Sequence, residues 1–232
     1  MKNLLIIYAF LCLLTSCTNT DSDFDSIKIS NVILIDKSEN TQLNPENMSN
    51  PFDDKGKRYY NAIINYQNDN QFPNSINEMT GQIKYVSDQV FMKKMTQKRL
   101  IVFNDSIVQS IMSDPDNFMI NIVQSSQLTS NAKVTLINFL QGLISHRQLD
   151  FTISYNYIVD YEGTIIGNSS FDEDETETIL TIASISRYSL FSEAERKDKD
   201  WDLSAGNKPA RKFFSTNDTS VISVIALLQS LI

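Results

Sequence analysis

Residues 169–191 read SSFDEDETETILTIASISRYSLF, and this stretch decides the fold class. Ser170 is suited to cap a helix, and Glu173 three residues later completes a capping box. The acidic residues 172–175 crowd the expected first turn, where the helix dipole favours negative charge. The apolar residues that follow recur at helical spacing: Ile179, Ile182, Ile185 and Leu190. Arg187 lies near the expected C-terminal end, where a cation is favoured, so the stretch predicts a helix.

The same apolar spacing recurs along the rest of the chain, in six further stretches: 59–66, 83–91, 100–111, 134–144, 158–165 and 221–232. Asp114-Pro115 is expected to break the chain. Only 6 Gly and 5 Pro occur, which argues against a sandwich of many tight turns. We therefore predict an all-α helical bundle of about six or seven helices in residues 50–232, preceded by an extended N-terminal segment.

Two segments near the C-terminus carry less regular signals. Residues 193–212 are charged and contain Gly206 and Pro209, so they are expected to form a mobile connection. The closing stretch 221–232 is apolar on most sides and too short to span a bilayer. It is interpreted as a last core helix, with a partner-seeking or membrane-seeking tail as the alternative.

The N-terminus has the features of an export signal. Lys2 precedes eleven apolar residues, 4–14, which is short of the roughly 20 that a membrane span needs. Leu14-Thr15-Ser16-Cys17 resembles the lipobox of bacterial lipoproteins, in which small residues precede an obligatory cysteine. The resemblance implies that residues 1–16 are a signal peptide and that Cys17 is lipidated, for example with palmitate. An ordinary signal peptide is the alternative.

A lipid anchor at Cys17 determines how the following residues are interpreted. Stable anchoring needs two or more acyl chains, because each buried CH₂ contributes only about 0.8 kcal/mol. Residues 17–26 are acidic and lack hydrophobic periodicity, so they are expected to form a flexible tether. In residues 27–49 isoleucines alternate and a polar loop follows, which predicts an extended segment and a loop. We expect an exported chain, anchored to the bacterial outer membrane and either periplasmic or surface-exposed.

The charge balance limits the class of partner. The formal net charge is −8, with 28 acidic and 20 basic residues, and loss of Lys2 with the signal makes the mature chain more acidic. An acidic surface argues against nucleic acid as a partner. The membrane, reached through the lipid on Cys17, and an unidentified protein are the expected partners.

Motifs for catalysis, metals and cofactors are absent from the sequence. His146 is the single histidine, and neither HExxH, GxSxG, GxGxxG nor a P-loop occurs. We therefore predict no enzyme activity, no metal and no cofactor. Paired carboxylates, as in glycosidases, stay open as an alternative, since such a pair is formed in space rather than in sequence.

The most distinctive local pattern is NPFDDKGKRYYNAIINY, residues 50–66. As a structural element it is a turn leading into a helix, in which Asp53 or Asp54 caps the helix and Gly56 permits a backbone angle that other residues avoid. The functional alternative is a docking surface, a possible interaction site built by three aromatic residues: Phe52, Tyr59 and Tyr60.

Two elements together suggest a family. Asn50-Pro51-Phe52-Asp53, followed by Gly56 and Asn61, and later Ile185-Ser186-Arg187-Tyr188-Ser189, resemble patterns of uncharacterised lipoproteins of Bacteroidota. The resemblance implies an exported helical domain and no particular activity. We expect a membrane-anchored binding or interaction module of the cell envelope. The alternatives are an envelope hydrolase with paired carboxylates and a membrane-active secreted effector that uses the apolar C-terminal tail.

Overall fold

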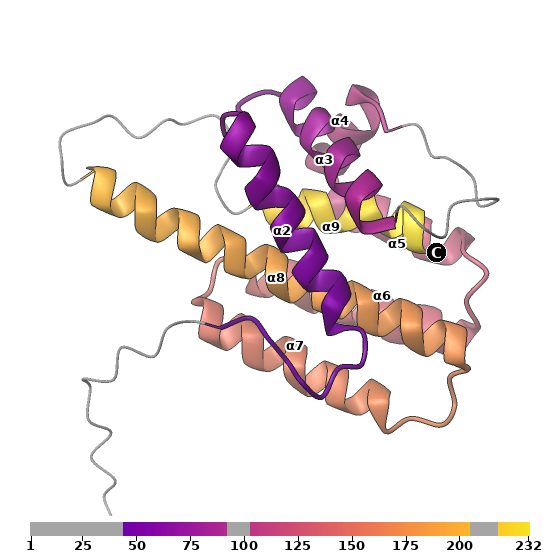
Figure 1. The fold of residues 1–232 in the computed structure, drawn as a ribbon. Coiled ribbons are helices and arrows are strands. Elements are labelled where there is room, and N and C mark those ends of the chain that lie inside the picture. The colour runs from indigo at the N-terminus through magenta and orange to yellow at the C-terminus, as the bar shows by residue number, and fades with distance from the viewer. Residues whose placement is uncertain (1–43, 92–102, 205–217) are drawn as a thin grey trace, which may run out of the picture. The chain divides into compact units, whose positions relative to one another are not determined.

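The computed structural model describes residues 44–91, 103–204 and 218–232, and this part of the chain is all-α, as predicted. The predicted signal peptide, Cys17, the tether and residues 27–43 lie outside the described residues. Figure 1 shows the described helices: α2 (Asp53–Asp69), α3 (Ile76–Phe91), α4 (Asp105–Ser113), α5 (Pro115–Ser125), α6 (Ser130–His146), α7 (Phe151–Ile166), α8 (Glu173–Ser204) and α9 (Asp218–Leu231).

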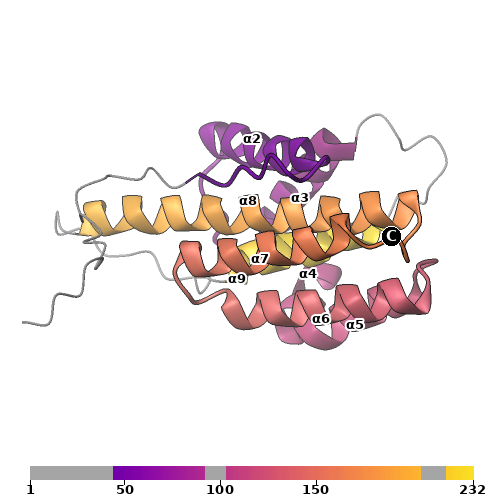
Figure 2. The ribbon, with the colours of Figure 1, turned by 90° about the horizontal axis from the view of Figure 1, so that it is seen from below.

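Helix α8 is the element on which most of the others pack. Helices α2, α7, α9 and α6 all contact α8, and α2 crosses it at an angle (Figure 1). Figure 2 shows α7 running alongside α8, to which a short connection joins it. Helix α9 in turn contacts α3, α4, α5 and α8. The middle of α8 is therefore enclosed, and residues 179–191 are all buried.

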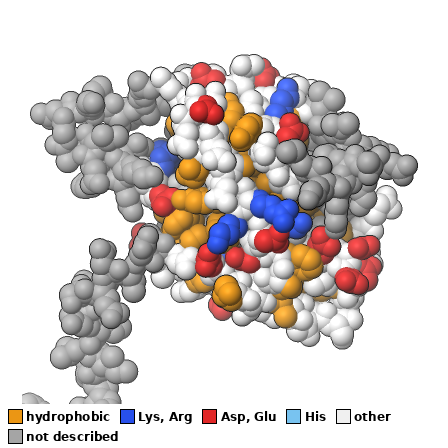
Figure 3. Space-filling view, in the orientation of Figure 1, with side chains coloured by type: hydrophobic (Ala, Val, Ile, Leu, Met, Phe, Trp, Pro, Cys, Tyr) orange, Lys and Arg blue, Asp and Glu red, His pale blue; other side chains and the backbone are white. Residues whose placement is uncertain are grey.

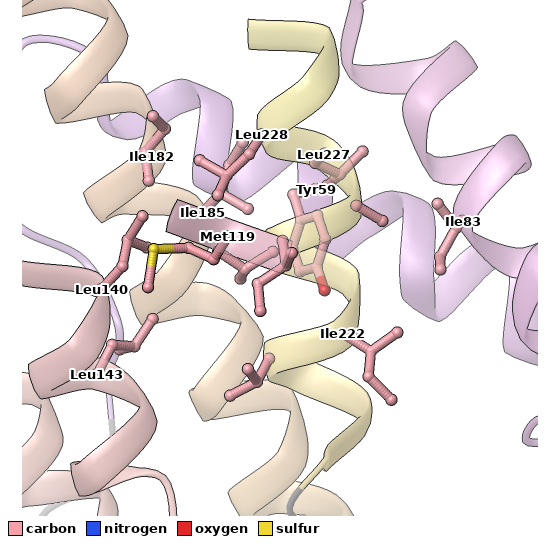
Figure 4. Close-up of a cluster of buried hydrophobic side chains, with 14 of the residues drawn as sticks. Tyr59, Ile83, Met119, Leu140, Leu143, Ile182, Ile185, Ile222, Leu227 and Leu228 are labelled. Atoms are coloured by element: carbon pink, nitrogen blue, oxygen red, sulfur yellow. The ribbon is translucent and has the colours of Figure 1, made fainter. Parts of the chain in front are cut away.

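The core forms where these helices meet. Tyr59 from α2, Ile83 from α3 and Met119 from α5 are among the side chains that fill it. Figure 4 shows Tyr59 directed toward α9, near Leu227. Burial of these side chains removes apolar surface from water, which contributes roughly 25 cal/mol per Å². Most of the stripes that the sequence predicts thus share one core, and a smaller cluster around Phe171 takes in Ile165 and Ile179.

The apolar C-terminal stretch is core. Residues 221–228 of α9 are all buried, with exposed fractions of 3% or less, and they lie between α8 and the α3–α5 region. The expectation of a last core helix is confirmed. A tail that seeks a membrane would have to withdraw these side chains from the core.

The described residues contain eight helices, one or two more than predicted, because α5 was missed. Asp114-Pro115 does end α4, but the same two residues also begin α5. The Asp114 carboxylate accepts a hydrogen bond from the Asn117 backbone N–H at 3.1 Å, and Pro115 occupies the first turn. Proline is favoured there because the missing N–H would have no partner inside the helix.

Helix α8 begins later and ends later than the sequence predicts. The capping box is formed by Asp172 and Glu175 rather than by Ser170 and Glu173. Asp172 Oδ1 accepts from the Glu175 N–H at 2.7 Å, and Glu175 Oε2 accepts from the Asp172 N–H at 3.4 Å. The helix then continues to Ser204, although residues 193–204 were predicted to belong to a mobile connection. That stretch contains no Gly or Pro and is rich in strong helix formers.

The surface mixes apolar and charged side chains. In the view of Figure 3, lysine and arginine side chains lie beside aspartate and glutamate, with apolar side chains between them. Among the described helices, none has the length and apolar character needed to cross a membrane.

Candidate functional site

A buried arginine on α8 joins three distant parts of the chain. The Arg187 side chain is 0% exposed, and its Nη2 lies 2.6 Å from Asp53 Oδ1 and 3.0 Å from Glu162 Oε1. Its Nη1 donates to the carbonyl oxygen of Pro45. Residues at the start of α2, in α7 and in the N-terminal loop therefore meet at one guanidinium.

Each carboxylate at this arginine has further donors. The Glu162 carboxylate accepts from Asn47 Nδ2 at 2.6 Å and from Asn50 Nδ2 at 2.7 Å. The Tyr188 hydroxyl donates to Asp53 Oδ2 at 3.0 Å. We call Asn47, Asn50, Asp53, Glu162, Arg187 and Tyr188 the Arg187 cluster. Such pairing is what allows charges to be buried at tolerable cost.

The electrostatics of the Arg187 cluster fix its protonation state. Burial acts to lower the pKa of Arg187, but Glu162 and Asp53 outweigh burial, and the pKa is raised. Burial, followed by the Asp53 carboxylate, raises the pKa of Tyr188. Arg187 is therefore charged and Tyr188 neutral across the physiological range. The cluster is suited to holding the chain in place and not to proton transfer.

Gly56 allows α2 to approach α8 closely. A Cβ at this position would lie 2.3 Å from Ser184 Oγ and 2.4 Å from Tyr188 Cδ2. The Gly56 N–H instead donates to Ser184 Oγ at 3.1 Å, and that hydroxyl donates to the Asp53 carbonyl at 3.2 Å. Gly56 lies within a regular helix, so its role is close approach rather than the unusual backbone angle that the sequence suggested.

The start of α2 is organised differently from the prediction. Phe52 occupies the N-cap position without a capping side chain, and neither Asp53 nor Asp54 caps the helix. Asn50 Oδ1 accepts from the Phe52 N–H at 2.8 Å. Asp53 is committed to Arg187, and Asp54 forms an exposed pair with Arg58 at 2.8 Å.

The three aromatic residues of the proposed docking surface do not share a surface. Tyr59 is fully buried, and its hydroxyl lies 2.9 Å from Ser189 Oγ, within hydrogen-bonding distance; burial raises its pKa to about 12. Tyr60 is half-buried and donates to Glu195 at 2.6 Å. Phe52 is half-buried against the small apolar cluster that contains Phe171. The structural interpretation of this motif is the one that the geometry supports.

Two members of the Arg187 cluster are recognisable in the sequence as charged residues at buried positions of their helices. Glu162 follows Ile158 by four positions and precedes Ile165 by three, so it lies on the buried stripe of α7. Arg187 lies near the middle of α8, within the continuously buried stretch 179–191, and not at the C-terminal end of the helix. A charge on a buried stripe needs a buried partner, and that requirement was the available signal.

A pocket lies close to the Arg187 cluster, farther along α8. Its volume is about 550 Å³, and its walls are residues 147–154, at the α6–α7 connection, and four residues of α8: Leu190, Glu193, Ala194 and Lys197. Leu149 and Ile153 are about half exposed at this site. The volume is within the range of ligand pockets, roughly 300–1,000 Å³.

Glu193 is the buried charge of this pocket. Its side chain is 5% exposed, and neither carboxylate oxygen accepts a hydrogen bond from the described residues. The Lys197 Nζ atom lies 3.5 Å from Oε1. Burial raises the pKa of Glu193, and Ser220 and Lys197 offset this only in part.

The pocket also bears on the paired-carboxylate alternative. It contains two acids, Glu193 and Asp150, but only Glu193 is buried, whereas Asp150 is exposed at the start of α7. The other buried acids are committed elsewhere: Glu162 to Arg187, and Glu175 to the Thr129 N–H and the start of α8. Among the described residues, no group of acidic, histidine or cysteine side chains is arranged to hold a metal ion.

Comparison of the chain with family models, with curated proteins and with solved structures finds no match.

Proposed function

We propose that this chain is an exported lipoprotein, anchored through Cys17 to the bacterial outer membrane, whose helical domain is a binding module of the cell envelope. The sequence Leu14-Thr15-Ser16-Cys17 after a short apolar run carries the anchoring part of the proposal. We also propose that the chain is related to the Bacteroidota lipoproteins that it resembles. The domain lies either on the periplasmic face or on the outer face of that membrane, which the experiment below distinguishes.

The attachment of the N-terminal loop supports an anchored role. In the sequence, residues 45–53 follow the segment that begins at Cys17. The Arg187 cluster holds residues 45–53 to α7 and α8. Tyr155 adds a hydrogen bond from its hydroxyl to the Glu46 carbonyl at 2.9 Å. A domain tethered through this end is thereby attached by buried charge-assisted bonds, which are stronger than neutral ones.

A binding role draws support from the pocket beside Glu193. Its lining mixes apolar side chains with polar and charged ones, so it offers a ligand both packing surface and polar partners. The hydrolase alternative has less support, because only one of the two acids in that pocket is buried. The membrane-active alternative requires α9 to leave the core.

The anchor is tested by feeding an alkyne-tagged palmitate to a bacterial host that expresses the full chain. We expect label and membrane association in the wild type and in the matched control Cys12→Ala, and neither in Cys17→Ala. Label retained by Cys17→Ala would overturn the anchoring part. Protease treatment of intact and of lysed cells then distinguishes the two faces, since only a surface domain is digested before lysis.

A further inference from the structure

The pocket beside α8 has a mixed lining, with apolar side chains on two sides and one buried carboxyl group, that of Glu193. Leu149, Phe151 and Ile153 line it from the α6–α7 side, and Leu190 and Ala194 line it from α8. Its exposed residues, Leu149 and Ile153, place apolar surface where solvent reaches the site. An apolar ligand body therefore has walls to pack against.

The Glu193 carboxylate lacks the donors that a buried carboxylate ordinarily has. Both of its oxygens are without a hydrogen bond from the described residues. Lys197 Nζ is 3.5 Å from one oxygen, longer than a normal N–H···O bond, and Lys197 is 39% exposed. Glu162, in contrast, has three donor contacts, one from each of three side chains. The desolvation of Glu193 is therefore only partly compensated within the described part of the chain, by Ser220, Lys197 and Arg196.

We propose that this pocket binds a small organic ammonium ion: a protonated amine at Glu193, carried on an apolar body that packs against Leu149, Phe151 and Ile153. The inference deepens the proposed binding function by naming the ligand class, and it is independent of the lipid anchor. The amine supplies the donors that Glu193 lacks, and the apolar body covers the half-exposed side chains.

A cation is favoured over an anion because the buried group is the acid. The pocket also contains Arg147, Lys197 and the first residues of α7, which together favour an anion. The Arg147 and Lys197 side chains, however, are more exposed than Glu193, which is the most deeply buried charge in the pocket lining. The free energy available on binding is greatest at the buried charge that has no donor.

The test uses three isosteric probes with the full chain, purified from membranes in a mild detergent. Phenethylammonium, 2-phenylethanol and 3-phenylpropionate share an apolar body and differ in charge. Calorimetric titration of each probe measures its dissociation constant, and the variants in the same detergent control for uptake into micelles. We expect phenethylammonium to bind at least tenfold more tightly than either of the other two.

Two matched substitutions on α8 locate the charge that is responsible. Glu193→Gln keeps the shape and removes the charge, so it should abolish the preference for phenethylammonium. Glu195→Gln makes the same change two residues away, at a carboxylate that bonds Tyr60 and does not line the pocket. It should leave the preference unchanged. Ile153→Ala, at a half-exposed wall residue, should weaken phenethylammonium and the alcohol by a similar factor.

Lys197→Gln separates a cation site from an anion site by the sign of its effect. Lys197 competes with an ammonium ligand for Glu193, so its removal should tighten phenethylammonium binding several-fold. An anion site would instead lose affinity for 3-phenylpropionate. Equal binding of the three probes, preference for 3-phenylpropionate, no binding at all, or an unaltered Glu193→Gln variant would each overturn the proposal. None of these outcomes changes the palmitate-labelling result at Cys17, so failure here is distinct from failure of the anchor.

Discussion

Helix α8 buries two charges six residues apart and treats them in opposite ways. Arg187 has two carboxylates and a carbonyl around it, and each oxygen of its partner Glu162 also accepts from an asparagine. Glu193 has an ion pair with Lys197 at 3.5 Å, a weaker influence from Arg196, and no hydrogen bond from the described residues. The two positions are about 9 Å apart along the helix, and their side chains point about 120° apart around it. A charge with partners on several elements fastens those elements together, whereas a charge with none is available to a ligand.

Removal of the Arg187 charge should change the stability of the fold most. Arg187→Met should destabilise the fold by about 3–5 kcal/mol, because it leaves the buried Glu162 and the partly buried Asp53 without a cation. Urea unfolding followed by circular dichroism measures the loss. Adding Glu162→Gln to Arg187→Met should recover part of it, since one uncompensated charge is then removed. A loss below about 1 kcal/mol would show that the Arg187 cluster does not hold the chain.

The close approach of α2 to α8 gives the next effect. Gly56→Ala should cost about 1–3 kcal/mol, because the added Cβ collides with Ser184 Oγ and the Tyr188 ring. Gly163→Ala on α7 is the matched control, with nothing within 4 Å of its added Cβ, and it should stabilise by up to about 1 kcal/mol. Thermal unfolding of both variants checks the contrast. Equal effects would mean that the two helices readily move apart.

The pH dependence of stability should differ in sign from that of an ordinary ion pair. The pKa of Glu193 is raised in the folded state, so the folded chain binds more protons than the unfolded chain between pH 4.5 and that raised value. This contribution to stability therefore falls as pH rises through that window. The groups that act on Glu193 are Ser220 on α9 and the cations Lys197 and Arg196 on α8. Arg147 and Asp150 are the other charged residues of the pocket wall.

Substitution of Glu193 tests that sign directly. Glu193→Gln should be more stable than the wild type by about 1 kcal/mol at neutral pH, and the difference should vanish toward pH 4. Denaturant unfolding at several pH values measures both quantities. The opposite trend would be a variant that becomes less stable than the wild type as pH rises. It would mean that Glu193 has a strong partner in the folded chain.

The smallest expected effect distinguishes the two possible caps of α8. Asp172→Ala should cost about 1 kcal/mol, because Asp172 accepts from the Glu175 N–H. Ser170→Ala should change stability by less than about 0.5 kcal/mol, since Ser170 is exposed and bonds only Asn168 and Asn131. Unfolding curves that rank the two variants the other way would return the cap to Ser170.

The success of the fold prediction and the absence of the Arg187 cluster from the sequence-based expectations have one physical cause. Apolar periodicity reports which face of a helix is buried, so the all-α class and the core role of α9 follow from local sequence. Asp114-Pro115 was ambiguous because the residues that end one helix are also suited to begin the next. Helix α8 is longer than predicted because Gly206 and Pro209 lie only in the last part of the charged stretch 193–212. Residues 193–204 contain neither and continue the helix.

The pairing of residues within the Arg187 cluster does not follow from local sequence patterns. Its members Asp53 and Arg187 were noticed separately, each with a local role, as a cap and as a cation near a helix end. Their pairing depends on the crossing of α2 over α8, which periodicity does not determine. The pocket has the same origin, since the α6–α7 connection and Glu193 meet only when α7 packs on α8.

The distances along the chain that the Arg187 cluster closes also set an order of events in folding. Asn47 meets Glu162 across 115 residues, and Asp53 meets Arg187 across 134. Loops of that length are costly to close before other contacts exist, so the pairing of helices near in sequence precedes it. As the chain is synthesised from its N-terminus, Asp53 emerges long before its partner and stays hydrated until α8 is complete. We therefore expect residues 45–53 to dock late in folding, after Arg187 is in place to pair with Asp53.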